Sequence, residues 1–369
     1  LPGLQLALAS VRAGQTLADH VGFAVPLAAL PFRLFFPYLL GQTTLPPYAY
    51  SAWNVGSFAE TSDYVGLTTL VLAAIGATAR GGPRTGFWAG RFVAALALST
   101  GNDLGLGWVT YHLPALNWRR APGRYAFEVA LASSVLAAAG VAAIERAAAS
   151  RRLIAACIAA VGALAAVLAG VVAAFGGELG ARIAHDFGLA NVAPGALDPL
   201  HNAALGIPPA ALAFGCLAIV AFARRPQANA TRALLILAVT ADLASFAWFG
   251  YWNFGAFPLA RAGVPAYVAR LRAAIAPLGQ RVLGVPTQDA GAGVPPNLNV
   301  LWNIASVRGY TNLALARSAA LLRVDTPAGL REVLAAGDRT LDAAGVRYAI
   351  VPRAMAPRRP LGDPFDPGT

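Results

Sequence analysis

Residues 146–176 read RAAASRRLIAACIAAVGALAAVLAGVVAAFG, a short gap that carries three arginines followed by a long apolar run. The run from 153 to 176 contains no charged residue and exceeds the roughly 20 residues that an α-helix needs to cross a bilayer. The gap before it holds Arg146, Arg151 and Arg152. This stretch predicts a membrane-spanning helix with positive residues at one end.

Two further gaps of the same kind separate apolar runs elsewhere in the chain. One holds Arg80 and Arg84, and the other holds Arg224, Arg225 and Arg232. Positive residues favour the cytoplasmic side of a membrane, so all three gaps are expected to lie in the cytoplasm. The expected crossings cover residues 64–79, 85–102, 122–144, 153–176, 207–223 and 233–251.

The composition agrees with lipid as the solvent for much of the chain. It is 57% hydrophobic and 12% charged, whereas soluble domains carry about 25% charged residues. All 28 basic residues are arginine, and the net charge is +11. Because these arginines are spread over loop ends and the tail rather than along one basic stripe, we reject a nucleic-acid-binding function.

The expected fold is therefore an all-α polytopic membrane protein with about six transmembrane helices and a small extracytoplasmic α/β domain at the C-terminus. Residues 1–63 form an outer, interfacial segment, since 21–41 is apolar but holds three prolines and Arg33. Residues 64–251 form the transmembrane domain, and 252–369 the outer domain. Within the latter, helices are expected at 265–275 and 327–336, and strands at 281–285 and 346–351.

The sequence 118–125, WRRAPGRY, places three arginines where the third crossing enters from the outside. Guanidinium groups bind phosphate in a bidentate manner, and a helix N-terminus also attracts anions. Arg120 and Arg124 are four residues apart, so both can face one side of the helix start. They are candidate ligands for the phosphate of a lipid-linked donor. The alternatives are anchoring in the outer head groups, or pairing of Arg124 with Glu128.

Carboxylates are also found at the outer ends of the expected crossings. Glu60 and Asp63 precede the first crossing, and Asp103 follows the second. Each is a candidate general base, with helix capping as the alternative. Asp242 lies inside the sixth apolar run, where an ionisable group requires a partner or a wet cavity. Arg91 or Arg124 is its expected partner, and a structural role is favoured over transport or catalysis.

Metal and cofactor sites are not expected. The four histidines (His20, His112, His185 and His201) are scattered through outer segments, and Cys157 and Cys216 lie inside apolar runs as small buried hydrophobes. We expect no cofactor. The chain starts at Leu1 without a signal-like beginning, so a preceding N-terminal part is expected.

At these residues the chain resembles the YfhO-like family of bacterial multi-pass membrane proteins. The most specific match is RAPGRY at 120–125. A second match is ETSDYVG at 60–66, in which Tyr64 opens the first crossing, and a third is Asp242. Weaker matches follow in the same order over nearly the whole chain, at residues 1–12, 281–284, 296–297, 309–317 and 345–348. Tyr64 and Asp242 are interpreted as structural positions within the membrane.

Families of this kind are similar to the GT-C glycosyltransferases. The resemblance implies a bacterial cytoplasmic-membrane enzyme that transfers a sugar from a polyprenyl-phosphate donor to a cell-envelope polymer or lipid on the outer face. Arg120 and Arg124 would bind the donor phosphate, while Glu60, Asp63 and the loop around Asp103 would line the acceptor side. GT-C enzymes usually carry their catalytic acid in the first outer loop, which would precede Leu1 here.

Two other functions stay open from the sequence. A transporter or flippase requires polar residues along a path through the membrane, and only Asp242 and Arg91 favour one. A non-catalytic assembly or scaffold protein would use the outer domain to bind envelope components.

Overall fold

The computed structural model describes residues 5, 6, 8–36, 39, 64–79, 84–114, 116, 117, 120–186, 199–204, 206–222, 229–248, 266–276, 279–284, 298–307, 315–324, 327–334 and 339–350. The chain divides into two compact units. One unit is Thr16–Ala256, and the other combines Leu1–Gln15 with Phe257–Thr369. The first residues of the chain, expected to form part of an outer segment 1–63, thus belong to the same unit as the C-terminal region.

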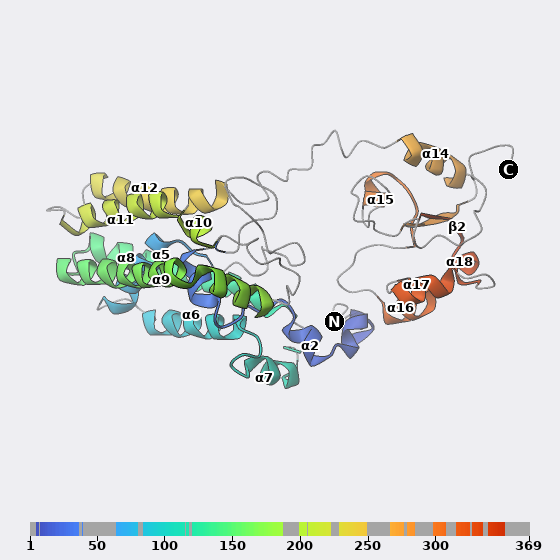
Figure 1. Cartoon of the computed structure of the whole chain (residues 1–369), viewed down its shortest axis with the longest axis horizontal. Helices are drawn as coiled ribbons and strands as arrows, with labels where there is room; N and C mark the ends of the chain where they lie inside the picture. Colours follow the sequence, from blue (N-terminus) through green and yellow to red (C-terminus); the bar gives the residue numbers. More distant parts are fainter. Residues whose placement is uncertain are drawn as a thin grey trace. The chain divides into compact units, whose positions relative to one another are not determined.

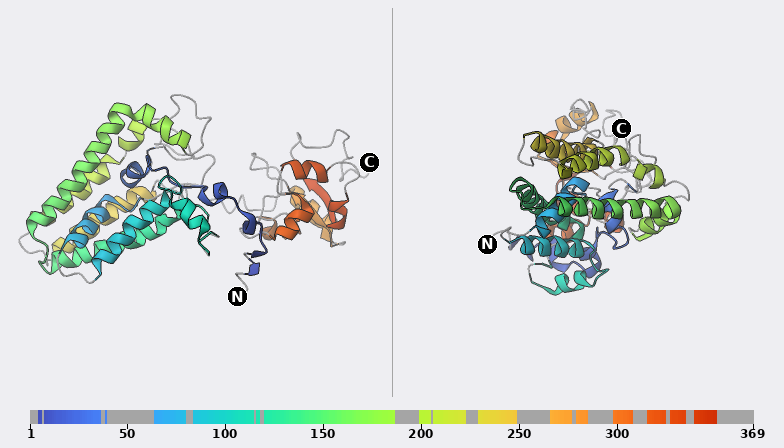
Figure 2. Two further views of the ribbon diagram at one scale, coloured as in Figure 1. Left: turned by 90° about the horizontal axis from the view of Figure 1, so that it is seen from below. Right: turned by 90° about the vertical axis from the view of Figure 1, so that its left-hand side faces the viewer.

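The unit Thr16–Ala256 is built from helices that lie side by side (Figures 1 and 2). Its longer helices are α5 (Leu67–Thr78), α6 (Thr85–Ser99), α8 (Ala126–Glu145), α9 (Arg151–Asp186), α11 (Ile207–Phe222) and α12 (Asn229–Trp248). Its shorter helices are α2 (Leu17–Val21), α3 (Leu30–Phe35), α7 (Leu106–His112), α10 (Pro199–Ala204) and the 3-10 helix η2 (Pro122–Tyr125). All six expected apolar runs form helices, with ends shifted by a few residues except at α9, which continues to Asp186.

Three helices are long and apolar enough to cross a membrane: Pro122–Glu145, Arg151–Ile183 and Pro199–Phe222. On α9, large apolar side chains such as Leu164 and Val167 are exposed, which is typical of a lipid-facing surface. The helix α5 is apolar but has only 12 residues. These findings confirm a mostly helical, membrane-associated protein, while the number of crossings stays a prediction.

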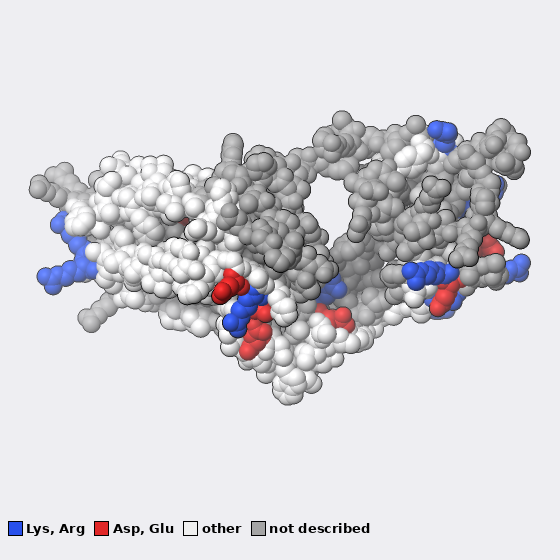
Figure 3. Space-filling view, in the orientation of Figure 1, with Lys and Arg blue, Asp and Glu red and all other residues white. Residues whose placement is uncertain are grey.

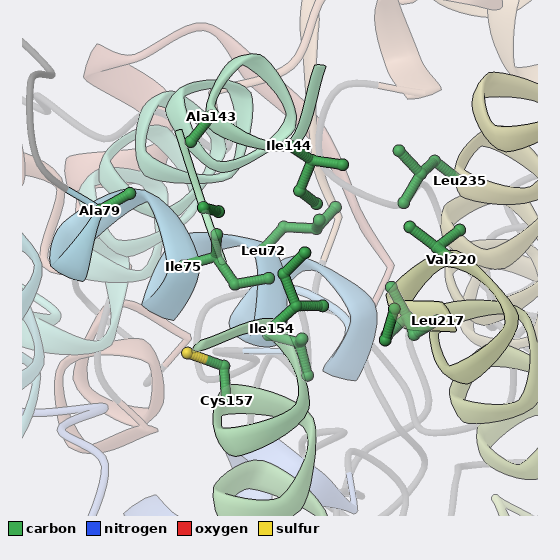
Figure 4. Close-up of a cluster of buried hydrophobic side chains, with 13 residues drawn as sticks. Leu72, Ile75, Ala79, Ala143, Ile144, Ile154, Cys157, Leu217, Val220 and Leu235 are labelled. Atoms are coloured by element: carbon green, nitrogen blue, oxygen red, sulfur yellow. The ribbon is translucent and has the colours of Figure 1, made fainter. Parts of the chain in front are cut away.

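Successive long helices alternate in direction. At one end, the last turns of α5, α8 and α11 pack with the first turns of α9 and α12, as Figure 4 shows. The described arginines of the three gaps (Arg84, Arg146, Arg151, Arg152 and Arg232) flank the helix ends on this side, and Figure 3 shows positive side chains gathered there. Arg232, expected in a gap, lies in the first turn of α12, where its Nε donates to Glu145 Oε1 at 2.8 Å. Arg80, Arg224 and Arg225 lie outside the described residues.

Two glycines allow α5 and α8 to cross with their backbones in contact. A Cβ atom at Gly76 would lie 2.0 Å from the carbonyl oxygen of Leu136, and one at Gly140 would lie 2.0 Å from that of Leu72. Only glycine fits either position. Close approach of backbones through small residues is the usual packing mode of helices in lipid.

The region 177–206, which lies between two of the expected crossings, begins as helix. The helix α9 continues to Asp186 past a kink at Phe175, which has non-helical angles (φ −131°, ψ 18°), and Figure 2 shows the bend. Val172, Leu179 and Ile183 share one face and pack against the cluster that includes α3. The expected end at residue 176 was wrong because this apolar face continues beyond the uncharged run.

The described residues of the segment 21–41, which are 21–36 and 39, pack into the helical unit. The helix α3 contributes Phe32, Leu34 and Phe35 to an apolar cluster with Leu168 and Val172 of α9. Arg33 lies in the same helix and is buried. As expected from its prolines, the described part of this segment holds no helix long enough to cross a membrane.

The other unit contains two parallel strands, β1 (Arg281–Gly284) and β2 (Val346–Ile350), close to the expected positions. Val282 and Leu283 point to opposite faces of β1 and are fully buried in separate clusters. The helices α14 (Ala266–Ile275) and α17 (Pro327–Val333) cover these two faces, and both were expected. Shorter helices are α15 (Leu298–Leu301), α16 (Ala316–Leu322) and α18 (Thr340–Ala343).

The N-terminal segment pairs with this C-terminal unit. Ser10 forms an antiparallel bridge with Leu315, and the Ala316 N–H donates to the Ala9 carbonyl oxygen at 2.9 Å. Two chain connections therefore join the two units, one at Gln15–Thr16 and one at Ala256–Phe257.

Candidate functional site

Arg120 and Arg124 flank the turn where α8 begins. Ala121, between them, has a left-handed backbone (φ 62°), and Arg124 lies in η2, directly before α8. The preceding corner starts at the end of α6 and passes through Gly101 and Gly105, both with positive φ. We call residues 99–124 the outer corner, because they follow α6 and precede α8 at the end opposite the arginine-rich gaps.

The segment 16–27 packs directly on the outer corner. The Val25 N–H donates to the Ser99 carbonyl at 2.9 Å, and the Gly123 N–H donates to the Phe23 carbonyl at 3.2 Å. At Gly101, an added Cβ atom would lie 2.6 Å from the Cβ of Ala24. Glycine at that position thus lets a distant part of the chain complete the corner.

Asp103 takes part in this packing. It is exposed, and its Oδ2 accepts the Leu27 N–H at 2.7 Å. One carboxylate oxygen therefore fixes the segment 16–27 to the corner. The expected catalytic role of Asp103 stays a prediction, and Oδ1 is the oxygen on which it would depend.

Arg120 is half-buried in the outer corner. Its Nε is buried and has no hydrogen-bond partner among the described residues. A buried donor without an acceptor costs free energy of about 1–3 kcal/mol, so this atom has a spare hydrogen bond to offer.

Asp19 lies within electrostatic reach of Arg120. The backbone and side chain of Thr16 donate to Asp19 Oδ2, at 3.0 and 2.8 Å, and these bonds lower the pKa of the Asp19 carboxyl. The positive charge of Arg120 lowers that pKa further, as the smallest of the causes. Asp19 is thus held mainly by the capping box that starts α2.

His20 is a residue of this corner that sequence reasoning missed. It is buried, its Nε2 lies 2.9 Å from Thr110 Oγ1, and its ring meets the edge of Tyr111. From the sequence, the four histidines are predicted only to be scattered through outer segments. The pattern Thr16-x-x-Asp19, a capping signature, was a readable signal that a helix starts here and carries His20.

The ion pair of Glu128 differs from the expected alternative. Arg91 Nε donates to Glu128 Oε2 at 3.0 Å, and Arg91 Nη2 bonds to the same oxygen. This pair joins α6 to α8. Glu128 is therefore the partner of Arg91, and the suggested pairing of Arg91 with Asp242 was wrong, because Arg91 faces the neighbouring helix α8.

Asp242 instead binds the start of α5. It is fully buried in α12, its Oδ2 accepts the Thr68 N–H at 2.7 Å, and its Oδ1 accepts the Tyr64 hydroxyl. Gly66, the N-cap of α5, has no side chain and a φ of 91°. The carboxylate of Asp242 supplies the cap that Gly66 lacks, so the two positions expected to be structural lie together.

The remaining expected site residues are Glu60 and Asp63, which lie outside the described residues, as does Arg119. In the described part of the chain, no three His, Cys, Asp or Glu side chains come together to hold a metal ion.

Comparisons with known proteins add no relative. No family model, curated protein or solved structure matches this chain.

Proposed function

We propose that this chain belongs to a multi-pass protein of the bacterial cytoplasmic membrane that transfers a sugar from a polyprenyl-phosphate donor to a cell-envelope polymer or lipid. In this proposal six helices cross the membrane, the arginine-rich gaps face the cytoplasm, and the outer corner and the C-terminal α/β unit face outward. The alternating helix directions support this topology, because they bring the described arginines of the gaps to one end.

The observation that carries the donor site is the spare donor of Arg120. A buried guanidinium Nε without a partner among the described residues is suited to a phosphate oxygen. Arg124 follows four residues later in η2, at the start of α8, where the helix N-terminus also favours an anion. Together the two arginines would hold the phosphate that links the sugar to the lipid.

The chemistry needs only positioning and one base. The bond between the anomeric carbon and the phosphate oxygen breaks, and the acceptor hydroxyl oxygen bonds to that carbon. Negative charge grows on the leaving phosphate, and the arginines stabilise it. A carboxylate takes the acceptor proton, with Glu60, Asp63 or Asp103 in this role. The resemblance to GT-C glycosyltransferases supports the same reaction.

The transporter alternative loses the two charges that favoured it. Asp242 caps α5, and Arg91 pairs with Glu128, so both have structural partners. Neither group needs a transported solute to explain its place in the membrane.

The test is Arg120→Ala in the full-length protein, with Arg146→Ala as the matched control. Arg146 is an exposed arginine at the opposite end of α8. We expect Arg120→Ala to weaken binding of a polyprenyl phosphate probe about tenfold or more, which corresponds to the loss of one charge-assisted contact. Transfer from a radiolabelled polyprenyl-phosphate sugar to a cell-envelope fraction should fall as well. Equal binding and transfer in both variants would contradict the proposal.

A further inference from the structure

One face of α6 is exposed along most of the helix. Gly86, Phe87, Gly90 and Val93 all lie on it, with Phe87 59% and Val93 64% exposed. A Cβ atom added at Gly86 or at Gly90 would meet no atom within 4 Å. The opposite face packs on α8, a helix long and apolar enough to cross a membrane. The exposed face therefore lies at membrane depth in the proposed topology, on which this inference rests.

Two other glycines in the same unit allow helix backbones to come into contact. At Gly76 and Gly140 the backbones of α5 and α8 touch, and each glycine is required there. Gly86 and Gly90 have the four-residue spacing that lets two helices in lipid approach equally closely. Within one copy, no described residue takes advantage of it.

Charged groups at the rim of this face point to its occupant. The Arg91–Glu128 pair lies between α6 and α8, with the two side chains 39% and 27% exposed. Both hydrogen bonds of Arg91 go to Glu128 Oε2, and its guanidinium carbon also lies 5.7 Å from the centre of the Trp88 ring. Arg91 Nη1 and Glu128 Oε1 make no further hydrogen bond in the described part of the chain. Half-exposed charges facing lipid are costly unless another polar surface covers them.

We propose that a second copy of this chain covers the α6 face in a two-fold symmetric dimer. A two-fold axis brings the same patch from both copies together, so an arginine and a glutamate on one copy meet a glutamate and an arginine on the other. A pair of opposite charges is complementary to itself in this arrangement. The exposed glycines let the two α6 helices approach, and Phe87 and Val93 pack around the contact.

The first test compares two glycine variants of the full chain by sedimentation equilibrium in density-matched detergent micelles. Gly90→Leu blocks the proposed contact, and Gly170→Leu is the control on α9. A Cβ atom added at either position meets no described atom within 4 Å, so the two variants make matched additions to exposed helix faces. We expect a dimer for the unmodified chain and for Gly170→Leu, and an apparent dissociation constant about tenfold higher or more for Gly90→Leu. A monomeric unmodified chain, or equal behaviour of the two variants, overturns the proposal.

The second test uses disulfide cross-linking in native membranes. Cysteines at equivalent positions next to a two-fold axis form a disulfide when their Cα atoms lie within about 7 Å. With Cys157 and Cys216 replaced by Ala, Gly90→Cys should cross-link to a covalent dimer under mild oxidation, and Gly170→Cys should not. Cross-linking at Gly170 but not at Gly90 would place the interface on α9 and reject the α6 face.

Discussion

Asp242 and Arg120 lie at the same end of the helical unit but are used differently. Both oxygens of the Asp242 carboxylate accept hydrogen bonds, from Tyr64 and from the backbone of Thr68. Arg120 is only half-buried, and yet its Nε is buried without a partner among the described residues. The more deeply buried charge is thus the one that the fold has already satisfied.

This difference shows that burial alone is a poor guide to function in a membrane protein. An ionised group in the membrane is expected to be functional by default, but Asp242 completes a helix cap and leaves no oxygen without a hydrogen bond. The better guide is hydrogen-bonding capacity that the fold leaves unused, and by that measure Arg120 is the stronger candidate. Substitutions at the two sites should therefore separate stability from binding.

The largest expected effect is that of Asp242→Ala. It leaves the Thr68 N–H and the Tyr64 hydroxyl buried without an acceptor, so the free energy of unfolding should fall by about 3 kcal/mol. Asp242→Asn keeps one carbonyl oxygen and should lose about half as much. Denaturant unfolding in detergent, followed by tryptophan fluorescence, measures both values. An Asp242→Ala variant as stable as the unmodified chain would show that the cap contributes nothing and would remove the contrast with Arg120.

A smaller loss is expected at Asp103, whose single hydrogen bond to Leu27 is exposed. Asp103→Ala should lower the free energy of unfolding by about 1 kcal/mol, and Asp103→Asn should be close to neutral because its amide oxygen still accepts the bond. The same two variants test catalysis. If sugar transfer falls in the stable Asp103→Asn variant, the negative charge has a chemical role, whereas unchanged transfer assigns Asp103 to structure alone.

Much of the helical unit could be predicted from local sequence. Apolar runs between arginine-bearing gaps predicted every long helix, because a helix that faces lipid must be apolar along its whole length. The end of α9 could not be predicted in this way. Beyond Phe175 the helix is amphipathic, and its continuation depends on Leu179 and Ile183 packing on a cluster formed by α3.

The candidate site was less predictable for the same reason. Arg120 and Asp103 stood out because of their residue types next to helix ends. The contribution of His20 and of Leu27 depends on contacts with residues 90 and 76 positions away, at His20–Thr110 and Leu27–Asp103. No periodicity or motif in the sequence specifies such contacts. The glycines at 101 and 107 permit them but do not identify the partner.

Arg120→Ala should leave the free energy of unfolding within about 0.5 kcal/mol of that of the unmodified chain, since a half-buried side chain with an unsatisfied Nε contributes little to stability. Thermal unfolding of the purified protein measures this, with Asp242→Ala as the reference for a large loss. A drop comparable to that reference would mean that Arg120 holds the fold together. Any loss of donor binding in Arg120→Ala would then have a structural cause.

The smallest expected effect is that of the Asp19 charge on stability. Its pH dependence shows whether the positive charge of Arg120 is already neutralised by Asp19. Because the folded state lowers the pKa of Asp19, its stabilising contribution is present above the ordinary pKa and is lost as the pH falls through the folded value. The difference in melting temperature between the unmodified chain and Asp19→Asn should therefore shrink as the pH drops below about 4. The bonds from Thr16 are the main cause of the shift and Arg120 the least.

Thr16→Ala removes the hydroxyl bond but keeps the backbone N–H, whose bond is the largest cause of the shift, so it should reduce this pH dependence only in part. Arg120→Ala removes the smallest cause and should leave nearly all of it in place. The opposite result would make Asp19 the counter-ion of Arg120. A phosphate would then have to displace a carboxylate in order to bind, which would weaken the case for a donor site at this corner. If Thr16 proves dominant, the charge of Arg120 is available to a ligand, and the contrast with the fully satisfied Asp242 holds.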